Sequence, residues 1–250
     1  MGKVKSAERT LRFLELLATK RNGISFTDIQ SELDIPKSSA HNLIQEFLDS
    51  NYLIYNKSTK KYYAGIEYIK LCTLCMQSTD LIDELSLLTS KLGEELELTT
   101  HAGILDKHNI MYLAKYENNS NLSLMHNMWL RIPAHCTAMG KMLLSQFTNE
   151  QLHIMYSSIP IEKITEKSID NLKDLISDLD IIRERGYATE ICEASIYTAC
   201  IALPLFQNGK MIAAFSVTFP IHAFKTADLN EIVKIMKKHK QITEQRLFAF

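Results

Sequence analysis

The sequence predicts an α+β fold in two parts: a winged helix-turn-helix over residues 1–66 and a sheet domain with flanking helices over residues 81–250, joined by a linker helix at 67–80. Three observations support this division. Apolar residues recur at helical spacing on both sides of a proline-containing turn. Two short β-rich segments then flank a lysine-bearing loop. The C-terminal part combines hairpin-like strand pairs with longer helical segments.

The first two helices are marked by their ends. One helix is expected over residues 6–20, and Gly23 stops it because glycine tolerates the left-handed conformation that closes many helices. Ser25 opens the second helix. Asp28, three positions later, completes a capping-box pattern in which two side chains satisfy free backbone N–H groups. Pro36 ends the following turn, since proline suits the start of a helix better than its interior.

The third helix, expected over residues 37–50 with Asn51 as its left-handed stop, has one apolar and one polar face. The spacing i, i+3, i+4, i+7, i+8 of a buried stripe is followed by Ala40, Leu43, Ile44, Phe47 and Leu48. The opposite face carries Ser38, His41, Asn42, Gln45 and Asp49. A helix that buries one face and offers short polar side chains fits the major groove of DNA. We therefore interpret it as a recognition helix; an ordinary solvated amphipathic helix is the plainer alternative.

A short hairpin is expected after the third helix. Residues 53–55 and 62–64 favour β structure, and the loop between them carries lysines suited to DNA phosphates. Asn and Gln can form paired hydrogen bonds to adenine, whereas Ser, Lys and the free N–H groups at a helix start more often hold phosphates. The predicted DNA-binding residues are Lys37, Ser38, Ser39, His41, Asn42, Gln45, Lys57, Lys60 and Lys61.

The rest of the chain alternates between helical and strand patterns. The expected helices cover residues 67–77, which link the two domains, 81–97, 138–147, 168–185 and 226–247. The expected strands form two pairs, 98–105 with 110–116, and 198–206 with 211–219. Asn208-Gly209 between the last two strands is the dipeptide that favours a tight type I′ hairpin.

Composition indicates a folded protein without a membrane anchor. Hydrophobic residues make up 46% and charged residues 23% of the chain, as in ordinary globular proteins. No apolar run reaches the roughly 18 residues that span a bilayer, and the N-terminus lacks the apolar core of a signal peptide, so we expect a cytoplasmic protein. Residues 1–70 carry a net charge of +3 and the remainder −4. This modest asymmetry agrees with nucleic-acid binding near the N-terminus.

No residue pattern predicts catalysis, a cofactor or a resident metal. The five cysteines lack the spacing of a disulfide scaffold and are expected as reduced thiols. Cys72 and Cys75 provide only half of a zinc-site spacing, and His135 next to a cysteine makes no nucleophilic pair, because chain neighbours seldom face each other. A looser zinc site from Glu190, Cys200 and His135 stays open as a less favoured alternative. No glycine-rich phosphate loop is present.

Three stretches together resemble one known family. They are FTDIQSELDIPKSSAHNLI at residues 26–44, IPAHCTAMGKMLL at 132–144, and the segments IRERGYA, CIALP and AAFSVTFP within 182–220. Their order and spacing resemble the IclR family of transcriptional regulators, and the resemblance covers nearly the whole chain. Family members often carry an arginine where this chain has Asn42, so an adenine contact is favoured there over a phosphate or guanine contact.

The resemblance implies a GAF- or PAS-like mixed sheet domain that binds a small molecule between a helix-bearing loop and the sheet. The site residues it implies are Ala138, Met139, Glu190, Cys200, Ser216 and Thr218. Independently of the resemblance, Ser216 and Thr218 alternate with apolar residues and so share one face of their strand. Backbone N–H groups at Ala138 and Met139 can meet a carboxylate, so an organic or aromatic acid is the expected effector. The alternative is that both hydroxyls bond to backbone or water.

The expected function is that of a ligand-responsive, sequence-specific DNA-binding transcriptional regulator, more specifically a repressor, acting on a double-stranded operator. One helix-turn-helix covers one half-site, so a homodimer or a dimer of dimers is expected. No enzymatic activity is expected. Two alternatives remain: an enzyme with a GAF-like catalytic domain, and a ligand- or protein-binding module without specific DNA binding.

Overall fold

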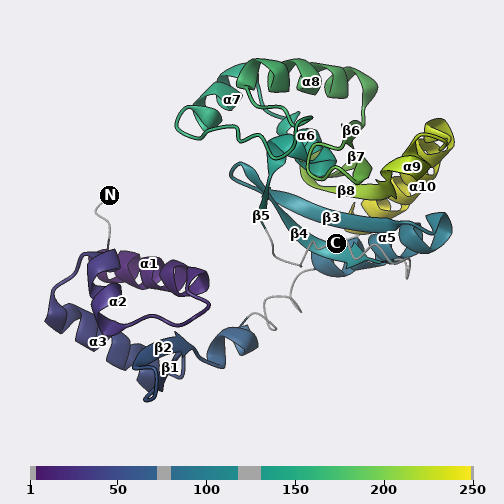
Figure 1. The fold of residues 1–250 in the computed structure, drawn as a ribbon. Helices are drawn as coiled ribbons and strands as arrows, with labels where there is room; N and C mark the ends of the chain where they lie inside the picture. Colours follow the sequence, from purple (N-terminus) through teal and green to yellow (C-terminus); the bar gives the residue numbers. More distant parts are fainter. Residues whose placement is uncertain (1–3, 72–79, 118–130, 249–250) are drawn as a thin grey trace. The chain divides into compact units, whose positions relative to one another are not determined.

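In a computed structural model of the protein, residues 4–71, 80–117 and 131–248 are described, and the chain divides into two compact units, Met1–Thr79 and Asp80–Phe250 (Figure 1). Each unit has its own buried core. The predicted linker helix begins as expected with helical residues 67–71. Its continuation, including Cys72 and Cys75, lies outside the described residues, so the linker and its boundaries stay a prediction.

The first unit has the predicted order of elements. It contains α1 (Lys5–Thr19), α2 (Phe26–Leu33), α3 (Lys37–Asp49), β1 (Leu53–Asn56) and β2 (Lys61–Ala64). The two strands form an antiparallel hairpin, and an additional bridge pairs Ile24 with Tyr62. The predicted stop after α3 is confirmed, because Asn51 has a left-handed φ of 57°. A core formed by all three helices and β1 holds the unit together, with Phe13 and Ile29 fully buried.

The second unit is built on a six-stranded sheet with the order β5-β4-β3-β8-β7-β6. Its strands are β3 (Thr99–Asp106), β4 (Asn109–Tyr116), β5 (Arg131–Pro133), β6 (Ala188–Ile191), β7 (Thr198–Gln207) and β8 (Lys210–Pro220). The predicted α+β class is confirmed. The expectation of a mixed sheet is corrected, because every strand pair among the described residues is antiparallel. Two-residue turns join β3 to β4 and β7 to β8, and connections this short can join only antiparallel neighbours.

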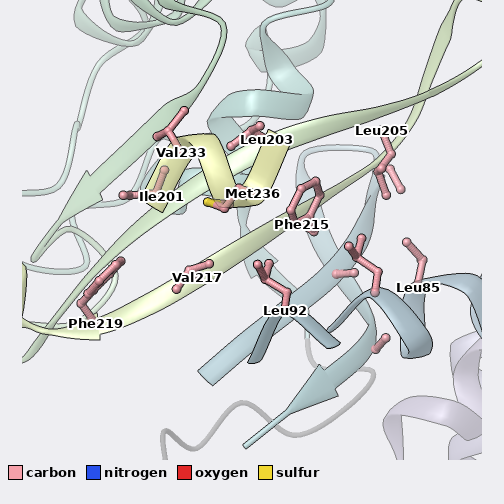
Figure 2. Close-up of a cluster of buried hydrophobic side chains, with 14 of the residues drawn as sticks. Leu85, Leu92, Ile201, Leu203, Leu205, Phe215, Val217, Phe219, Val233 and Met236 are labelled. Atoms are coloured by element: carbon pink, nitrogen blue, oxygen red, sulfur yellow. The ribbon is translucent and has the colours of Figure 1, made fainter. Parts of the chain in front are cut away.

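Helices cover both faces of this sheet. They are α5 (Asp80–Leu96), α6 (Ala138–Leu144), α7 (Asn149–Tyr156), α8 (Leu172–Arg185), α9 (Ile221–Phe224) and α10 (Leu229–Phe248), with a 3₁₀ turn η1 at Ala134–Cys136. One face packs with α5 and α10 around Phe215, Val217 and Phe219 of β8 (Figure 2). The other face packs with α6, α7 and α8. Since side chains alternate along a strand, Ser216 and Thr218 point toward the α6 side.

Several short elements were missed from the sequence. β5, β6 and α9 have three or four residues each, too few for a periodic pattern. α7 carried a usable signal, the capping box that Thr148 forms with Gln151. The helix predicted from residue 168 begins instead at Leu172, because the Ser168 hydroxyl accepts hydrogen bonds from the N–H groups of a preceding turn and Asn171 caps the helix.

Candidate functional site

The helix-turn-helix is fixed by local hydrogen bonds. The Ser25 hydroxyl accepts a bond from the Asp28 N–H at 3.2 Å, and the Asp28 carboxylate accepts one from the Ser25 N–H at 3.3 Å. The Ser25 hydroxyl also donates to the Asp28 carboxylate at 2.7 Å, and this bond, followed by the one from the Ser25 N–H, holds the pKa of Asp28 below its ordinary value. Asp34 ends α2 with a left-handed φ of 50°, and Pro36 stands immediately before α3. The predicted capping box and turn are confirmed.

α3 presents its polar face outward. Ala40, Ile44 and Phe47 are buried, whereas five of the predicted DNA-binding residues are exposed: Lys37, Ser38, His41, Asn42 and Gln45. Ser39 is half-buried and offers less of its side chain. The Gln45 side-chain amide donates to the Asp49 carboxylate at 2.8 Å, so this bond must break or bend before Gln45 reads a base edge.

The wing is a tight basic turn. The Asn56 side-chain oxygen accepts hydrogen bonds from the N–H groups of Ser58 and Thr59 at 2.9 and 3.2 Å, which closes the loop between β1 and β2. Lys57 and Lys60 are exposed at its tip. Lys61 is half-buried, and its ammonium donates to the Asn22 carbonyl at 3.4 Å, so it supports the wing as well as carrying charge.

All six residues implied as an effector site line one enclosed cavity in the second unit. Ser216, Thr218 and Cys200 come from neighbouring strands, Glu190 from the edge strand, and Ala138 and Met139 from the start of α6. The cavity measures about 20 Å³, which is room for roughly one water molecule. It is therefore closed to a larger ligand in this conformation.

Strand register brings the polar walls of the cavity together. Cys200 pairs with Thr218 across β7 and β8 and with Glu190 across β6 and β7. The Cys200 thiol lies 3.4 Å from the Thr218 hydroxyl. Burial, together with the negative charge of nearby Glu190, raises the pKa of the Cys200 thiol well above its ordinary value, so the sulfur stays protonated.

Glu190 is the principal charged group of the cavity wall. Its side chain is 1% exposed, and its Oε1 accepts hydrogen bonds from the N–H groups of Glu193 at 2.6 Å and Ala194 at 3.2 Å. Burial raises the pKa of Glu190 above its ordinary value, and this outweighs the opposing effects of the two N–H donors and of Lys141. The carboxyl therefore takes up a proton more readily than an exposed glutamate would.

Five further lining residues were not predicted: His101, Tyr112, Thr137, Ala194 and Thr198. Thr137 had a local signal, because its hydroxyl caps α6 by accepting a bond from the Gly140 N–H at 2.9 Å. His101 reaches the cavity through its pairing with Ser216 across β3 and β8. That pairing joins strands more than a hundred residues apart, and no local pattern predicts it.

The three residues of the looser zinc alternative do not lie together. His135 lines a different hollow beside His108, Tyr156 and Glu162, and its Nε2 lies 2.9 Å from the Glu162 carbonyl oxygen. Burial lowers the pKa of His135, which favours the neutral ring. Across residues 4–71, 80–117 and 131–248, no three His, Cys, Asp or Glu side chains gather as a metal-binding group. No helix in this part of the chain is long and apolar enough to cross a membrane.

A winged helix-turn-helix followed by a sheet domain with an internal polar cavity defines the class of two-domain, ligand-responsive DNA-binding regulators. Comparison of the sequence with protein families supports this class. The family model "IclR helix-turn-helix domain" matches residues 6–56, and "Bacterial transcriptional regulator IclR C-terminal" matches residues 73–243. The chain belongs to the IclR family and is a DNA-binding transcriptional regulator, as the sequence motifs predicted.

Individual relatives extend over nearly the whole chain. The HTH-type transcriptional regulator KdgR of Escherichia coli K12 is 27% identical over 93% of this chain and 89% of its own length. The transcriptional repressor IclR of the same organism is 22% identical over 97% and 90%. Among solved structures, an IclR homolog from Microbacterium hydrocarbonoxydans complexed with 4-hydroxybenzoate superposes with a TM-score of 0.77, at 20% identity over 97% of this chain and 98% of that one. This last likeness supports the fold.

Proposed function

We propose that the protein is a cytoplasmic repressor whose hold on operator DNA is controlled by a small organic or aromatic acid bound in the cavity, and that it acts by binding rather than by catalysis. The observation that carries this proposal is the cavity itself, because the six residues implied by the family resemblance line one enclosed polar space. The IclR homolog from Microbacterium hydrocarbonoxydans, solved as a complex with 4-hydroxybenzoate, supports an aromatic acid as one ligand class.

The DNA contacts proposed are divided between α3 and the wing. Asn42 and His41, exposed on α3, are proposed to reach base edges, with Gln45 joining them once it leaves Asp49. The residues proposed to contact phosphates are Lys37, Ser38, Ser39, Lys57, Lys60 and Lys61. The start of α3 assists, since Lys37 and Ser38 lie beside its free backbone N–H groups.

A second copy of the chain is proposed to cover an apolar groove in the first unit. The groove has a volume of about 810 Å³ and is lined by residues of α1, α3 and β2, including Leu14 and Phe47, and by Tyr52, Tyr68 and Leu71 outside these elements. Exposed apolar side chains beside it, Leu11 and Ile69, favour association. Dimerisation through this face supplies the two recognition helices that a two-part operator requires; a dimer of dimers is the larger assembly proposed.

The proposed function is tested in two steps. Gel-shift titration on the region upstream of the gene, at physiological salt, is expected to give specific binding. A thermal-shift screen of small carboxylic and aromatic acids then identifies the effector, because a ligand at 100 times its dissociation constant adds about 2.7 kcal/mol to stability. Absence of specific DNA binding with and without every stabilising acid would reject the proposal. Substrate turnover by residues 80–250 alone would favour the enzyme alternative.

Asn42→Ala is expected to weaken operator binding by about 1–3 kcal/mol and to relax preference at one base pair, because an adenine-reading amide is lost. The matched control is Lys60→Ala at the exposed tip of the wing. That change should weaken binding to all sequences alike and reduce the slope of log affinity against log salt by about 0.9. Fluorescence anisotropy with a set of single-base operator variants measures both. Uniform loss in Asn42→Ala would indicate a phosphate contact.

An anionic effector is expected to bind more weakly as the pH rises. Burial has already raised the pKa of Glu190, and a carboxylate placed beside it raises that pKa further, so binding takes up a proton. Effector affinity is therefore full at pH values below the pKa of Glu190 in the free protein and declines as the pH rises above it. Glu190→Gln, a neutral side chain that can still accept the two N–H bonds, should flatten the profile. Calorimetry in two buffers of different ionisation enthalpy measures the proton uptake on binding. Equal slopes of log affinity against pH in wild type and Glu190→Gln would contradict the expectation.

A further inference from the structure

Lys141 is a fully buried lysine in α6, next to the residues that line the cavity. Its side chain is 2% exposed, and its ammonium lies 2.6 Å from Glu193 Oε1 and 2.9 Å from Asp178 Oδ2. Removing an ammonium from water costs several kcal/mol unless carboxylates and hydrogen bonds compensate. The three groups come from α6, α8 and the turn after β6, so this charge cluster joins three separate parts of the second unit.

The turn after β6, residues 192–197, is held mainly by side chains. Lys141 binds the carboxylate of Glu193, while the Ser168 hydroxyl donates to the Glu193 carbonyl at 2.6 Å and the Thr165 hydroxyl to the Cys192 carbonyl at 2.6 Å. Cys192 itself has a left-handed φ of 61°, uncommon for a residue with a side chain. A turn in this conformation depends on its anchors to stay in place.

The same turn controls the position of Glu190. The N–H groups of Glu193 and Ala194 both donate to Glu190 Oε1, and Ala194 lines the cavity. A continuous set of contacts therefore runs from the Lys141 ammonium through the side chain and backbone of Glu193 to the carboxyl group at the cavity wall. Displacing the turn removes one wall and releases Glu190.

Among the cavity walls, this turn is the one best able to move. The β7 and β8 walls belong to strands hydrogen-bonded within the sheet, and every residue of α6 is buried. The turn instead exposes 59% of Ile196 and 65% of Tyr197. Because the closed cavity has room for roughly one water molecule, a larger ligand requires a wall to yield.

We propose that Lys141 is a positioning residue for the effector cavity. Its ion pair with Glu193, called the hold below, fixes the turn 192–197 and, through that turn, the carboxyl of Glu190. Ligand entry then requires the hold to be released. Its importance for ligand response rests on the proposed function. The hold itself is a property of the ligand-free protein and is tested there.

The hold depends on the charge of Glu193. The charged groups that face Glu193 are Lys141 of α6, Asp178 of α8 and Glu190 of β6. Burial raises the pKa of Glu193 to about 7, with Lys141 opposing and the two other carboxylates adding to the rise. Above that pH the ionised carboxylate attracts the Lys141 ammonium fully; below it the neutral carboxyl group only accepts a hydrogen bond from that ammonium, without the attraction between opposite charges. Lowering the pH through 7 should therefore loosen the turn.

Hydrogen–deuterium exchange of the ligand-free full-length chain provides the test. In Lys141→Met, the peptide covering residues 191–198 is expected to exchange about tenfold faster at pH 8, with the β7 and β8 peptides near wild type, because the opening is local. Asp178→Asn is the matched control: it alters the cluster but keeps the Lys141–Glu193 contact, and should leave this peptide within about twofold of wild type. Unchanged exchange of 191–198 in Lys141→Met, or an equal rise throughout the second unit, would overturn the proposal.

Glu193→Gln tests the same hold should Lys141→Met fail to fold. After correction for the intrinsic effect of pH, wild-type protection of 191–198 is expected to fall between pH 8 and 6, whereas Glu193→Gln should be less protected at pH 8 and nearly independent of pH. A pH-independent wild type, or a Gln variant with the wild-type profile, rejects the proposal. Failure of every acid in the screen to bind wild type would instead reject the effector function and leave these exchange results to decide the hold.

Discussion

Replacing Gly140 with alanine is expected to destabilise the second unit by about 2–3 kcal/mol, although the same change inside an ordinary helix stabilises by about 1 kcal/mol. A Cβ at position 140 would lie 2.1 Å from the Ala134 carbonyl oxygen and 2.4 Å from its Cα. Both are backbone atoms of η1, which cannot turn aside as a side chain can. The clash therefore outweighs the gain in helix propensity and displaces the start of α6, where Ala138 and Met139 line the cavity.

Denaturant unfolding of the second unit, followed by circular dichroism, measures this loss. Gly186→Ala is the control, because a Cβ there meets nothing within 4 Å and only the left-handed φ of 77° opposes it. Its expected cost is about 1 kcal/mol, the penalty of a Cβ in the left-handed conformation. A Gly140→Ala protein as stable as wild type would mean that α6 and η1 separate easily and that the cavity can enlarge from the α6 side.

Phe13→Ala is expected to unfold the DNA-binding unit while leaving the effector unit folded. Phe13 is fully buried and packs edge-on against Phe47 of the recognition helix, with 4.9 Å between the ring centroids. Truncating such an aromatic costs about 3–5 kcal/mol. That is a large part of the roughly 4–10 kcal/mol available to a unit of this size. Operator binding should be lost because α3 no longer has the core that orients it.

Two measurements separate this outcome from general damage. Thermal unfolding should lose the transition of the first unit and keep that of the second, since each unit has its own core. Ile54→Ala, in the same unit but 55% exposed and outside the apolar groove, should cost less than about 0.5 kcal/mol in this assay. Retained operator affinity in Phe13→Ala would show that the recognition helix is oriented by contacts outside the core around Phe13.

Much of the candidate site was predictable because it depends on local rules. The alternation of Ser216 and Thr218 with apolar neighbours sufficed to place both hydroxyls on the face opposite Phe215. Resemblance to the family supplied Glu190 and the start of α6. The cavity residues that were missed, such as His101, lie in strands whose neighbours are distant in the chain. Their position depends on register, which is set by packing over the whole sheet.

The sequence by itself determined the elements of this protein whose causes lie within a few residues. Examples are the Ser25–Asp28 cap, the left-handed Asn51 and the hairpin at Asn208-Gly209, where φ is 51° and 75°. The tertiary structure alone decided that Lys141 would meet a carboxylate 52 residues away, and that the cavity would be closed. Caps and turns are governed by short-range sterics and hydrogen bonds, whereas a buried ion pair forms only where the packing of several elements brings its partners together.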